Sequence, residues 1–226
     1  AATTHWIATA VAMGILERRP NSYVGIERDR SAGEFAERAL RRGGLVGARI
    51  IVGDAGHVPL AAGCASVIVG EAMLSMQPVH KKRAIVSEAT RLLRPGGRYA
   101  IHELCVAPDD IDPGLLEQIQ RDLSRSIHVG VRIGTRAGWA RLLEEAGLRV
   151  EAVTTAPMHL LEARRLVSDE GAAGAARFVL NAVRTPGAAA RLLHLRGVFR
   201  AHGRHLSAVA LVARRTAPRG PPVRDP

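Results

Sequence analysis

Short apolar strands that end in a carboxylate constrain the fold of this chain more than any other feature. Three of them occur early in the sequence, each followed by an acid: Tyr23–Ile26 by Glu27, Ile50–Val52 by Asp54, and Ser66–Gly70 by Glu71. Continuous apolar strands of this kind are typical of a parallel sheet that helices cover on both faces. In open α/β sheets the ligand lies outside the carboxyl ends of the strands. We therefore expect Asp54 and Glu71 on one rim, although two solvated loop acids would give the same local pattern.

Helical and strand patterns alternate along the rest of the chain, which is typical of βαβ units. Helical spacing predicts helices over residues 3–19, 31–42, 79–93, 113–126 and 135–146, and further strands are predicted over 98–101, 148–154 and 206–213. The prediction is one doubly wound α/β domain over residues 1–213, with a mostly parallel sheet whose last strand is antiparallel and at or near an edge. Helical insertions at about 107–131 and 158–202 are expected to form a lid. The Pro/Arg-rich residues 214–226 are expected to be unstructured.

The positive charge of the chain suggests a nucleic-acid partner, but the distribution of that charge argues against one. The formal net charge is +11, with 32 Lys and Arg residues against 21 Asp and Glu residues. Lysine occurs only at Lys81 and Lys82, and the arginines are dispersed over the whole length without a single basic stripe. Aromatic residues, which stack on bases, make up 3% of the sequence. We therefore expect no nucleic-acid partner.

Membrane spans, signal peptides and metal sites are not predicted either. No run approaches the roughly 18 consecutive apolar residues of a transmembrane helix. The first residues lack the basic region and the cleavage site of a signal peptide. Cys64 and Cys105 form neither a disulfide framework nor a metal cluster, and the nine histidines show no paired ligand spacing. We expect a cytoplasmic protein without a metal site.

Four segments, taken in order, resemble the motifs of a known family. They are Y-V-G-I-E-R-D from Tyr23, I-V-G-D-A-G-H-V-P-L from Ile51, A-S-V-I-V-G-E-A-M-L from Ala65 and R-L-L-R-P-G-G-R-Y-A-I-H-E from Arg91. Together they are similar to class I S-adenosylmethionine-dependent methyltransferases, in particular to the small-molecule group around the ubiquinone and menaquinone methylases. The later segment W-A-R-L-L-E-E-A-G-L-R-V is also similar to that group. The resemblance covers residues 1–154 and implies a Rossmann-like fold, S-adenosylmethionine as cofactor and methyl transfer as the activity.

The resemblance also implies which residues hold the cofactor. Glu27 matches the acid that accepts hydrogen bonds from both ribose hydroxyls, because a vicinal diol offers two donors to a carboxylate. Arg28 would lie beside the adenine, where the family usually has an apolar residue. Asp54 matches the acceptor for the adenine amino group, with the backbone of Ala55 beside it. Glu71 matches the strand end near the methionyl part and the sulfonium.

The acceptor side of the site is predicted from residues that follow the third and fourth strands. Methyl transfer is an in-line displacement, so much of its acceleration comes from holding the acceptor near the methyl carbon. A base is needed only if the acceptor loses a proton. Candidate residues are His102 and His128 for the base, and Met73, Met76, His80 and Glu103 for contact with the substrate. Each lone histidine has the alternative of a packed or solvated side chain.

The acceptor itself is expected to be a small molecule. No D/N-P-P-Y/F motif follows the strand at 66–70, where the sequence reads G-E-A-M-L, and this argues against methylation of DNA amino groups. Two cysteines within or beside predicted strands do not indicate a site that methylates arsenite.

One part of the family pattern is not found in the sequence. The family's first strand and its glycine-rich G-x-G-x-G loop should precede the predicted helix at 3–19. That loop offers backbone N–H groups to the methionyl carboxylate, and its strand occupies the middle of the sheet. Without this strand we expect unpaired strand edges inside the protein and weaker cofactor binding. We also expect that a longer form, with residues before Ala1, would supply both the strand and the loop.

Two other functions stay open on the sequence. A nicotinamide-dependent oxidoreductase also has an acid after its second strand. However, Tyr23 and Tyr99 are followed four residues later by Glu27 and Glu103, so there is no Y-x-x-x-K pair. The third hypothesis is a methyltransferase-like fold that serves as a non-catalytic binding protein. A homodimer is compatible with each of the three.

Overall fold

A computed structural model describes residues 22–42, 47–157, 171, 174, 177 and 184–216 of the chain. The predicted helix at 3–19, part of the predicted insertion at 158–202 and the end of the tail lie outside these residues. The labelled elements are β1 (Tyr23–Glu27), α2 (Arg30–Arg42), β2 (Ala48–Val52), β3 (Ala65–Glu71), η1 (Leu74–Met76), α3 (Val79–Leu92), β4 (Leu93–Val106), α4 (Pro113–Ile127), β5 (Gly134–Thr135), α5 (Arg136–Glu145), β6 (Leu148–Pro157), α7 (Ala188–Ala201) and β7 (Leu206–Arg215).

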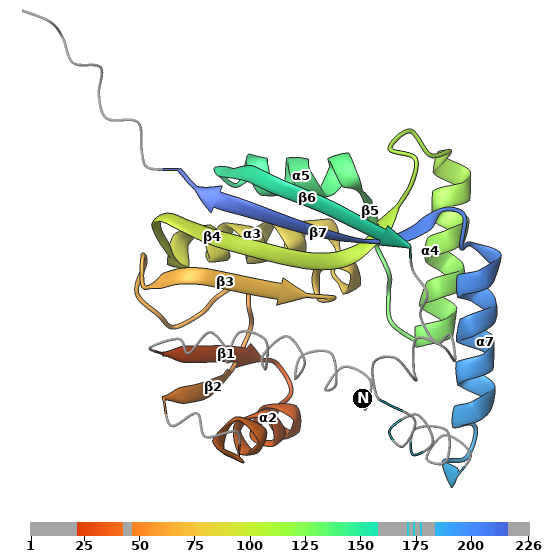
Figure 1. Ribbon diagram of the computed structural model, residues 1–226, viewed down its shortest axis with the longest axis horizontal. Helices are drawn as coiled ribbons and strands as arrows, with labels where there is room; N and C mark the ends of the chain where they lie inside the picture. The colour runs from red at the N-terminus through yellow and green to blue at the C-terminus, as the bar shows by residue number, and fades with distance from the viewer. Residues whose placement is uncertain are drawn as a thin grey trace, which may run out of the picture.

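The strands form two sheets (Figure 1). β1 and β2 run parallel in a two-stranded sheet, with α2 between them in the sequence. The larger sheet has the strand order β3-β4-β7-β6, and the two-residue β5 pairs with β4. β3 runs parallel to β4, whereas β7 is antiparallel to both β4 and β6. The predicted α/β class with an antiparallel last strand is confirmed, although β6 forms the edge and β7 lies one strand further in.

β1 and β3 are the neighbouring edges of the two sheets. β1 lies between β2 and β3 in Figure 1, but no ladder joins β1 to β3 in the part of the chain that the structure describes. On β3 the exposed fractions of Val67 and Val69 are 59% and 37%, which are large values for apolar strand residues. The described strands therefore form two separate sheets instead of the single sheet that the sequence pattern predicts.

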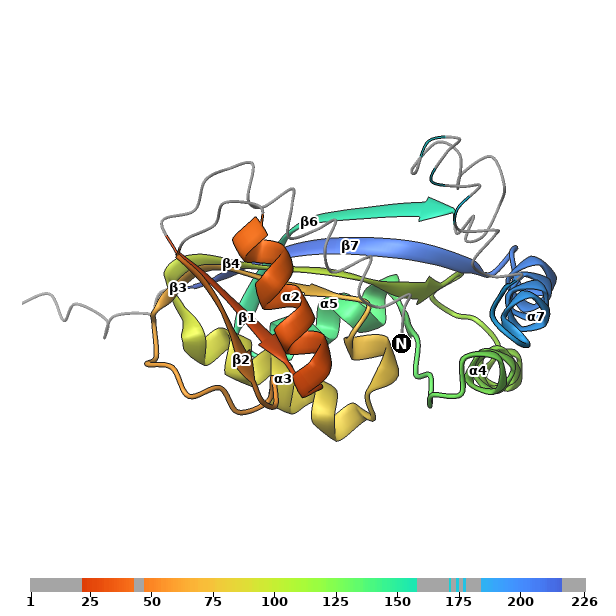
Figure 2. The same ribbon diagram turned by 90° about the horizontal axis from the view of Figure 1, so that it is seen from below.

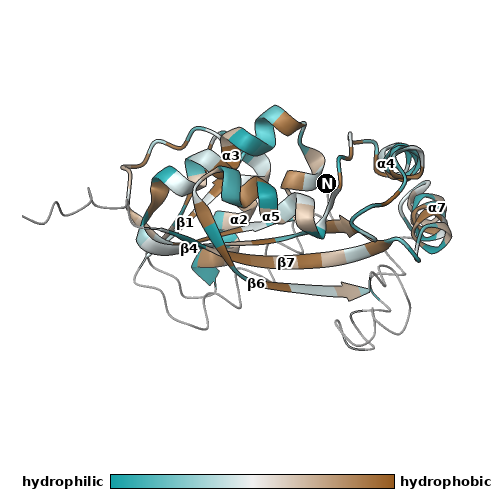
Figure 3. Cartoon of the chain, turned by 90° about the horizontal axis from the view of Figure 1, so that it is seen from above, coloured by the Kyte–Doolittle hydropathy of each residue, from teal (hydrophilic) through white to brown (hydrophobic). Residues whose placement is uncertain are grey.

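The main hydrophobic core lies between one face of the larger sheet and the helices α3 and α5. Figure 3 shows apolar residues along β4 and β7 beneath these helices. α3 buries Ile85 and Leu92, which are seven residues apart and so share one side of the helix. Thr135 precedes α5 and caps it, since its hydroxyl accepts a hydrogen bond from the N–H of Gly138, and the helix buries Trp139 and Leu143. Full burial of such a side chain contributes about 1.5–3 kcal/mol, so these helices fix the larger sheet.

α4 and α7 pack side by side beyond the carboxyl end of β4 (Figure 2). Asp112 caps α4 by accepting a hydrogen bond from the N–H of Leu115, and Pro113 occupies the first turn. At the end of α7, Nε2 of His202 lies 2.9 Å from Oδ2 of Asp122 in α4. A second core cluster joins the helix pair to the sheet and is formed by Val106, Ile119, Leu123, Val131, Ile133, Phe199 and Leu206.

β4 is longer than the sequence pattern predicts. The prediction ends this strand at Ile101 and places His102 and Glu103 on the rim, whereas β4 continues to Val106. The strand is extended because β7, which is distant in the sequence, pairs with it as far as Val106. His102 and Glu103 therefore lie inside a strand, where their side chains point to opposite faces of the sheet.

Candidate functional site

Glu27 closes the first strand and turns its side chain toward the start of α2. Its Oε1 accepts hydrogen bonds from the N–H groups of Arg28 at 2.7 Å and Asp29 at 3.0 Å. Its backbone carbonyl accepts from the N–H of Gly53 at 2.8 Å, so the loop after β2 starts beside the end of β1. The side chain of Arg28 is exposed. The carboxylate of Glu27 is thus fixed at the rim by its own following backbone.

Asp54 lies in the loop after β2 and is bound to a lysine that the sequence analysis did not single out. Its Oδ1 accepts from the N–H of Gly56 at 2.8 Å, and its Oδ2 accepts from Nζ of Lys81 at 2.6 Å. The hydrogen bond from Lys81 is the main cause that lowers the pKa of Asp54 below its usual range. Ala55, next in the chain, packs partly against the main core. Asp54 is therefore an ionised, half-exposed acceptor beside the carboxyl end of the small sheet.

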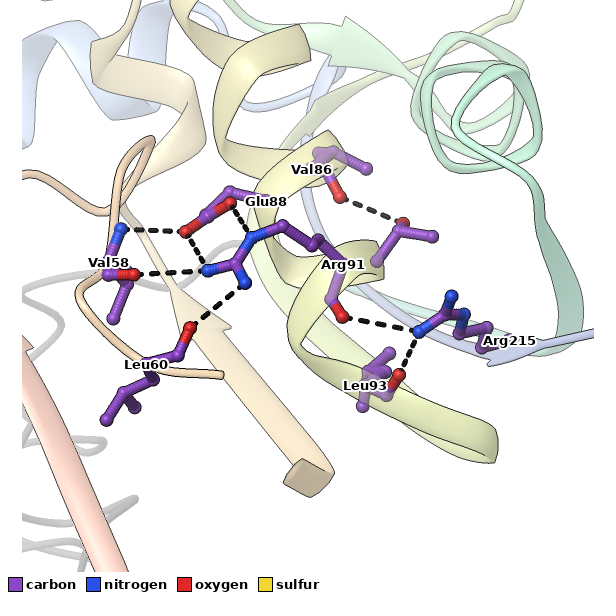
Figure 4. A network of polar contacts seen from close by, with 8 residues as sticks. Val58, Leu60, Val86, Glu88, Arg91, Leu93 and Arg215 are labelled. Atoms are coloured by element: carbon purple, nitrogen blue, oxygen red, sulfur yellow. Dashed lines mark hydrogen bonds and ion pairs between the residues drawn. The ribbon is translucent and has the colours of Figure 1, made fainter. Parts of the chain in front are cut away.

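The loop that follows Asp54 is fastened to α3 by a buried carboxylate (Figure 4). Glu88 accepts hydrogen bonds from the N–H of Val58 and from the guanidinium of Arg91, at 2.7 Å in each case. Arg91 also donates to the backbone carbonyls of Val58 and Leu60. The donors from Arg91 lower the pKa of Glu88 to about 2, because they stabilise the charged form. This ion pair holds the loop with Asp54 in one conformation.

Glu71 and His102 meet where β3 and β4 lie side by side as register partners. Nδ1 of His102 lies 3.3 Å from Oε1 of Glu71, and this contact raises the pKa of His102 above its usual range. The other carboxylate oxygen, Oε2, is buried and has no hydrogen-bond partner among the described residues. A buried acceptor without a donor costs about 1–3 kcal/mol, and more if it is charged. Oε2 of Glu71 therefore marks a place where a ligand's donor or cation would be stabilised.

The turn after Glu71 is strained and is held by β4. Ala72 has a φ of 48°, a left-handed conformation that is uncommon for a residue with a Cβ atom. Its N–H donates to the carbonyl of His102 at 2.8 Å. Glu103 is 2% exposed. It accepts hydrogen bonds from the N–H groups of residues 73–75, which follow Ala72, and from the hydroxyl of Ser75. The sequence predicts that Glu103 contacts substrate, whereas its oxygens are buried here and already accept these four hydrogen bonds.

Comparisons with known proteins agree with this geometry. Residues 8–101 match the family model described as a methyltransferase domain. An uncharacterised protein of Haemophilus influenzae is 29% identical over 118 residues, which cover 52% of this chain and 45% of that protein. An arsenite methyltransferase of Halobacterium salinarum is 30% identical over 121 residues, which cover 52% of this chain and 27% of that protein. The chain thus matches less than half of the length of these curated relatives.

A solved structure shows the same fold. The crystal structure of geranyl diphosphate C-methyltransferase from Streptomyces coelicolor, in complex with Mg²⁺, geranyl diphosphate and S-adenosyl-L-homocysteine, has a TM-score of 0.62 to this chain at 16% identity. The alignment covers 90% of this chain and 67% of that chain. Residues 8–101 of this chain thus match a methyltransferase domain, and the fold is that of a methyltransferase solved with S-adenosyl-L-homocysteine bound.

The acids at this rim have a chemistry that fits S-adenosylmethionine. The carboxylate of Glu27 suits the two donors of a ribose diol, and the ionised Asp54 suits an amino group. The buried Oε2 of Glu71, which has no donor in the described part of the chain, suits the positive charge of a sulfonium or an ammonium group. These three acids end or follow β1, β2 and β3, so the structure brings them to the same side of the two sheets.

The remaining predicted site residues are more scattered. Met73 packs partly against the main core, and Met76 packs partly against the second cluster, which includes residues of α4 and α7. His80 in the first turn of α3 is exposed. His128 is the exposed residue that ends α4, in a left-handed conformation with φ of 56°. Among the described residues, neither histidine contacts the pair of Glu71 and His102.

Some functional features of the methyltransferase domain have only faint signals in the sequence. Lys81 belongs to the only lysine pair in the chain, and Glu88 precedes Arg91 by three residues on a predicted helix. Both facts indicate that these side chains interact, but neither indicates that the partner is the loop after β2. Within the described ranges, no group of three or more His, Cys, Asp and Glu residues is placed to hold a metal ion. Nor is any described helix long and apolar enough to cross a membrane.

Proposed function

We propose that the protein transfers the methyl group of S-adenosylmethionine to a small-molecule acceptor. The observation that carries the proposal is the pair of Glu71 and His102 at the carboxyl end of β3, with one buried carboxylate oxygen that has no donor among the described residues. When bound, S-adenosylmethionine supplies an electrophilic methyl group. The carboxylate of Glu71 would stabilise the positive charge beside it, and the rim would hold the rest of the cofactor.

The adenosine half of the cofactor is proposed to bind to the small sheet and the loop after it. Glu27 would accept the ribose hydroxyls, and Asp54 the adenine amino group, with the N–H of Ala55 beside the ring. Arg28 is exposed, so its guanidinium can lie over the adenine, although the residue is not the usual apolar one. For Asp54 to accept the amino group, Lys81 has to share or release its oxygen.

The acceptor half of the site is proposed to have His102 as its base. The ring is half-exposed and is oriented by Glu71 through Nδ1, which leaves Nε2 for an acceptor proton. Because Glu71 raises the pKa of His102, the neutral form of the ring, which can accept a proton, becomes abundant only as the pH rises through this raised pKa. His128 and His80 are the weaker candidates, since both are exposed and neither is oriented by a carboxylate of the described residues.

The α4–α7 pair and its apolar cluster are proposed to choose the acceptor, with Met73 and Met76 on the wall toward them. A cytoplasmic location is proposed because both cysteines are free thiols. A homodimer is a further proposal, and light scattering of the purified protein would test it.

Calorimetric titration with S-adenosylhomocysteine, and separately with NADH, tests the proposed cofactor. We expect binding of S-adenosylhomocysteine and no binding of NADH. Glu71→Gln is expected to weaken that binding, because the uncharged amide no longer stabilises a cation and presents an NH₂ group instead of an acceptor oxygen. Glu151→Gln is the matched control, since Glu151 pairs with Arg98 and Arg214 away from the rim. Binding of NADH instead would favour the oxidoreductase.

An assay of methyl transfer from labelled S-adenosylmethionine to a panel of small phenols, amines and carbon acids tests catalysis. Acceptor-dependent incorporation of label, lowered by His102→Ala, is the expected result. Tight cofactor binding with no transfer to any acceptor would favour the alternative, a methyltransferase-like binding protein.

A further inference from the structure

Two consecutive residues of β4 make polar contacts with Glu71 and the turn that follows it. The side chain of Glu71 meets the ring of His102, and the N–H of Ala72 donates to the carbonyl of His102. The next three N–H groups and the hydroxyl of Ser75 donate to the carboxylate of Glu103. Since His102 and Glu103 point to opposite faces of the sheet, β4 holds residues 71–75 from both faces.

The carboxylate of Glu103 is saturated as an acceptor. Its Oε1 accepts from the N–H groups of Met73 at 3.0 Å and Leu74 at 2.7 Å. Its Oε2 accepts from the N–H of Ser75 at 2.9 Å and from its hydroxyl at 2.6 Å. An ionised carboxylate has about four acceptor sites, so the turn occupies all of them. Burial raises the pKa of Glu103, and the four donors act in the opposite direction by stabilising its charged form.

A buried cation continues this network toward the acceptor side. Lys82 is 7% exposed, and its Nζ donates to the carbonyl of Arg132 and lies 4.4 Å from the ring centroid of Trp139. Burial lowers the pKa of Lys82 to about 8, and the charge of Glu103 limits that decrease. The N–H of Arg132 donates in turn to the carbonyl of Ser75 at 2.7 Å. The turn is therefore connected to the segment that leads from α4 to α5.

We propose that Glu103 is a positioning residue for methyl transfer, because its carboxylate fixes the turn 72–75 and with it the places of Glu71 and Met73. This inference rests on the proposed function. A left-handed alanine costs about 1–2 kcal/mol, so the conformation of Ala72 persists only where its surroundings impose it. The four hydrogen bonds to Glu103, with the one from Ala72 to His102, are the contacts that impose it.

Two variants of the full chain test this role, each against a control. Glu103→Gln keeps the size of the side chain but turns one acceptor oxygen into an NH₂ group that opposes two donors. Ser75→Ala removes a single donor. The control is Leu148→Ala, which loses a side chain of the main core at the far end of β6, where Leu148 pairs with Arg215.

The probe is S-adenosylhomocysteine, titrated by calorimetry at a temperature where circular dichroism shows every variant to be folded. We expect Glu103→Gln to weaken binding about tenfold and Ser75→Ala about threefold, in line with the loss of charge-assisted hydrogen bonds. Leu148→Ala is expected to lower the Tm about as much as Glu103→Gln does, and to change the affinity less than about twofold. Hydrogen exchange of the amides 73–75 should become faster in Glu103→Gln and stay unchanged in Leu148→Ala.

The outcomes separate the two proposals. If the unchanged protein does not bind S-adenosylhomocysteine, the proposed function itself is overturned. If it binds, and Glu103→Gln binds equally well, only the positioning role is overturned. An equal loss of affinity in Leu148→Ala would also overturn it, since general destabilisation would then explain both. Should Glu103→Gln fail to fold, Ser75→Ala decides, and unchanged affinity with unchanged exchange at 73–75 counts against the role.

Discussion

The two sheets of the molecule differ in how much core supports them. The unit of β1, α2 and β2 has a small cluster around Leu40, with Tyr23, Ala48 and Ile50 partly packed against it. The larger sheet has a core that extends over β4, β7, α3 and α5. The acids proposed for adenosine belong to the weakly supported unit and its loop, whereas Glu71 and His102 belong to the larger sheet. Among the described residues, the end proposed for methyl transfer therefore has more core around it than the end proposed for adenosine.

This difference couples ligand binding to local stability. Regions with few buried apolar contacts open at a lower free energy than the protein as a whole. A ligand that contacts both sheets stabilises the form in which both are in place, by an amount that grows with its concentration over its Kd. The gain in stability should therefore be largest in β1 and β2, which have the smallest core among the described strands.

Hydrogen exchange gives the largest expected effect. Backbone amides of β1 and β2 should exchange on the order of 100-fold faster than those of β4 and β7, which corresponds to roughly 3 kcal/mol in opening free energy. Saturating S-adenosylhomocysteine should slow exchange in β1 and β2 more than in β4. Mass spectrometry of peptides from the two sheets measures both effects. Equal protection of the two sheets without ligand would contradict the comparison.

Glu88→Gln examines the connection between the two regions. The pKa of Glu88 is lowered to about 2, so its ionised form contributes stability above the ordinary value of about 4.3. This contribution to stability is lost as the pH falls from about 4.3 through the lowered pKa of about 2. We expect the variant to unfold with about 2–3 kcal/mol less free energy at pH 7, and the difference to shrink toward pH 2.

Urea unfolding of the two proteins at a series of pH values measures this difference. Glu145→Gln is the control, because Glu145 forms an exposed ion pair with Arg83 and should change the free energy of unfolding by less than about 1 kcal/mol. A pH-independent difference for Glu88→Gln would show that its charge is not the cause.

Glu71→Gln tests the pair of Glu71 and His102 on the larger sheet. The raised pKa of His102 means that the pair stabilises the protein while His102 is protonated, below its ordinary value of about 6.5. That contribution disappears as the pH rises through the raised value. Removing the charge of Glu71 should lower the pKa of His102, which NMR titration of the ring detects. Glu151→Gln should leave it unchanged, and a lack of response in Glu71→Gln would disprove the pairing.

Lys81→Met gives the smallest expected effect and concerns the adenosine end. The ion pair of Lys81 and Asp54 is half-exposed, so its loss should change the free energy of unfolding by less than about 1 kcal/mol. Because Asp54 would then be free for an amino group, S-adenosylhomocysteine should bind up to about fivefold more tightly. Weaker binding, measured by calorimetry, would show instead that Lys81 itself helps to hold the ligand.

The sequence was sufficient for features that depend on local pattern. The strands that end at Glu27 and Glu71 are recognisable because apolar runs stop at a charge, and α3 because its apolar residues repeat at helical spacing. The division of the described strands into two sheets was foreseen only as unpaired edges.

Features that depend on distant partners were not predictable. The length of β4 is set by β7, and the burial of Glu103 follows from that length, because alternation inside a strand turns its side chain into the core. Its four donors come from residues 73–75, whose sequence resembles an ordinary apolar segment. The partner of Lys81 was likewise unforeseen, because a lysine on a helix surface usually faces solvent.

The position of β7 in the sheet has a consequence for how the chain is made. β7 pairs with β4 across a large sequence separation, and Ser207 bonds to the carbonyl of Cys105, 102 residues earlier. β6 pairs only with β7 in the described sheet, so it gains a neighbour only after the last strand has left the ribosome. Such non-local pairing slows folding and leaves strand edges exposed during synthesis. Nascent chains that stop before Leu206 should therefore depend on chaperones more than the complete chain does.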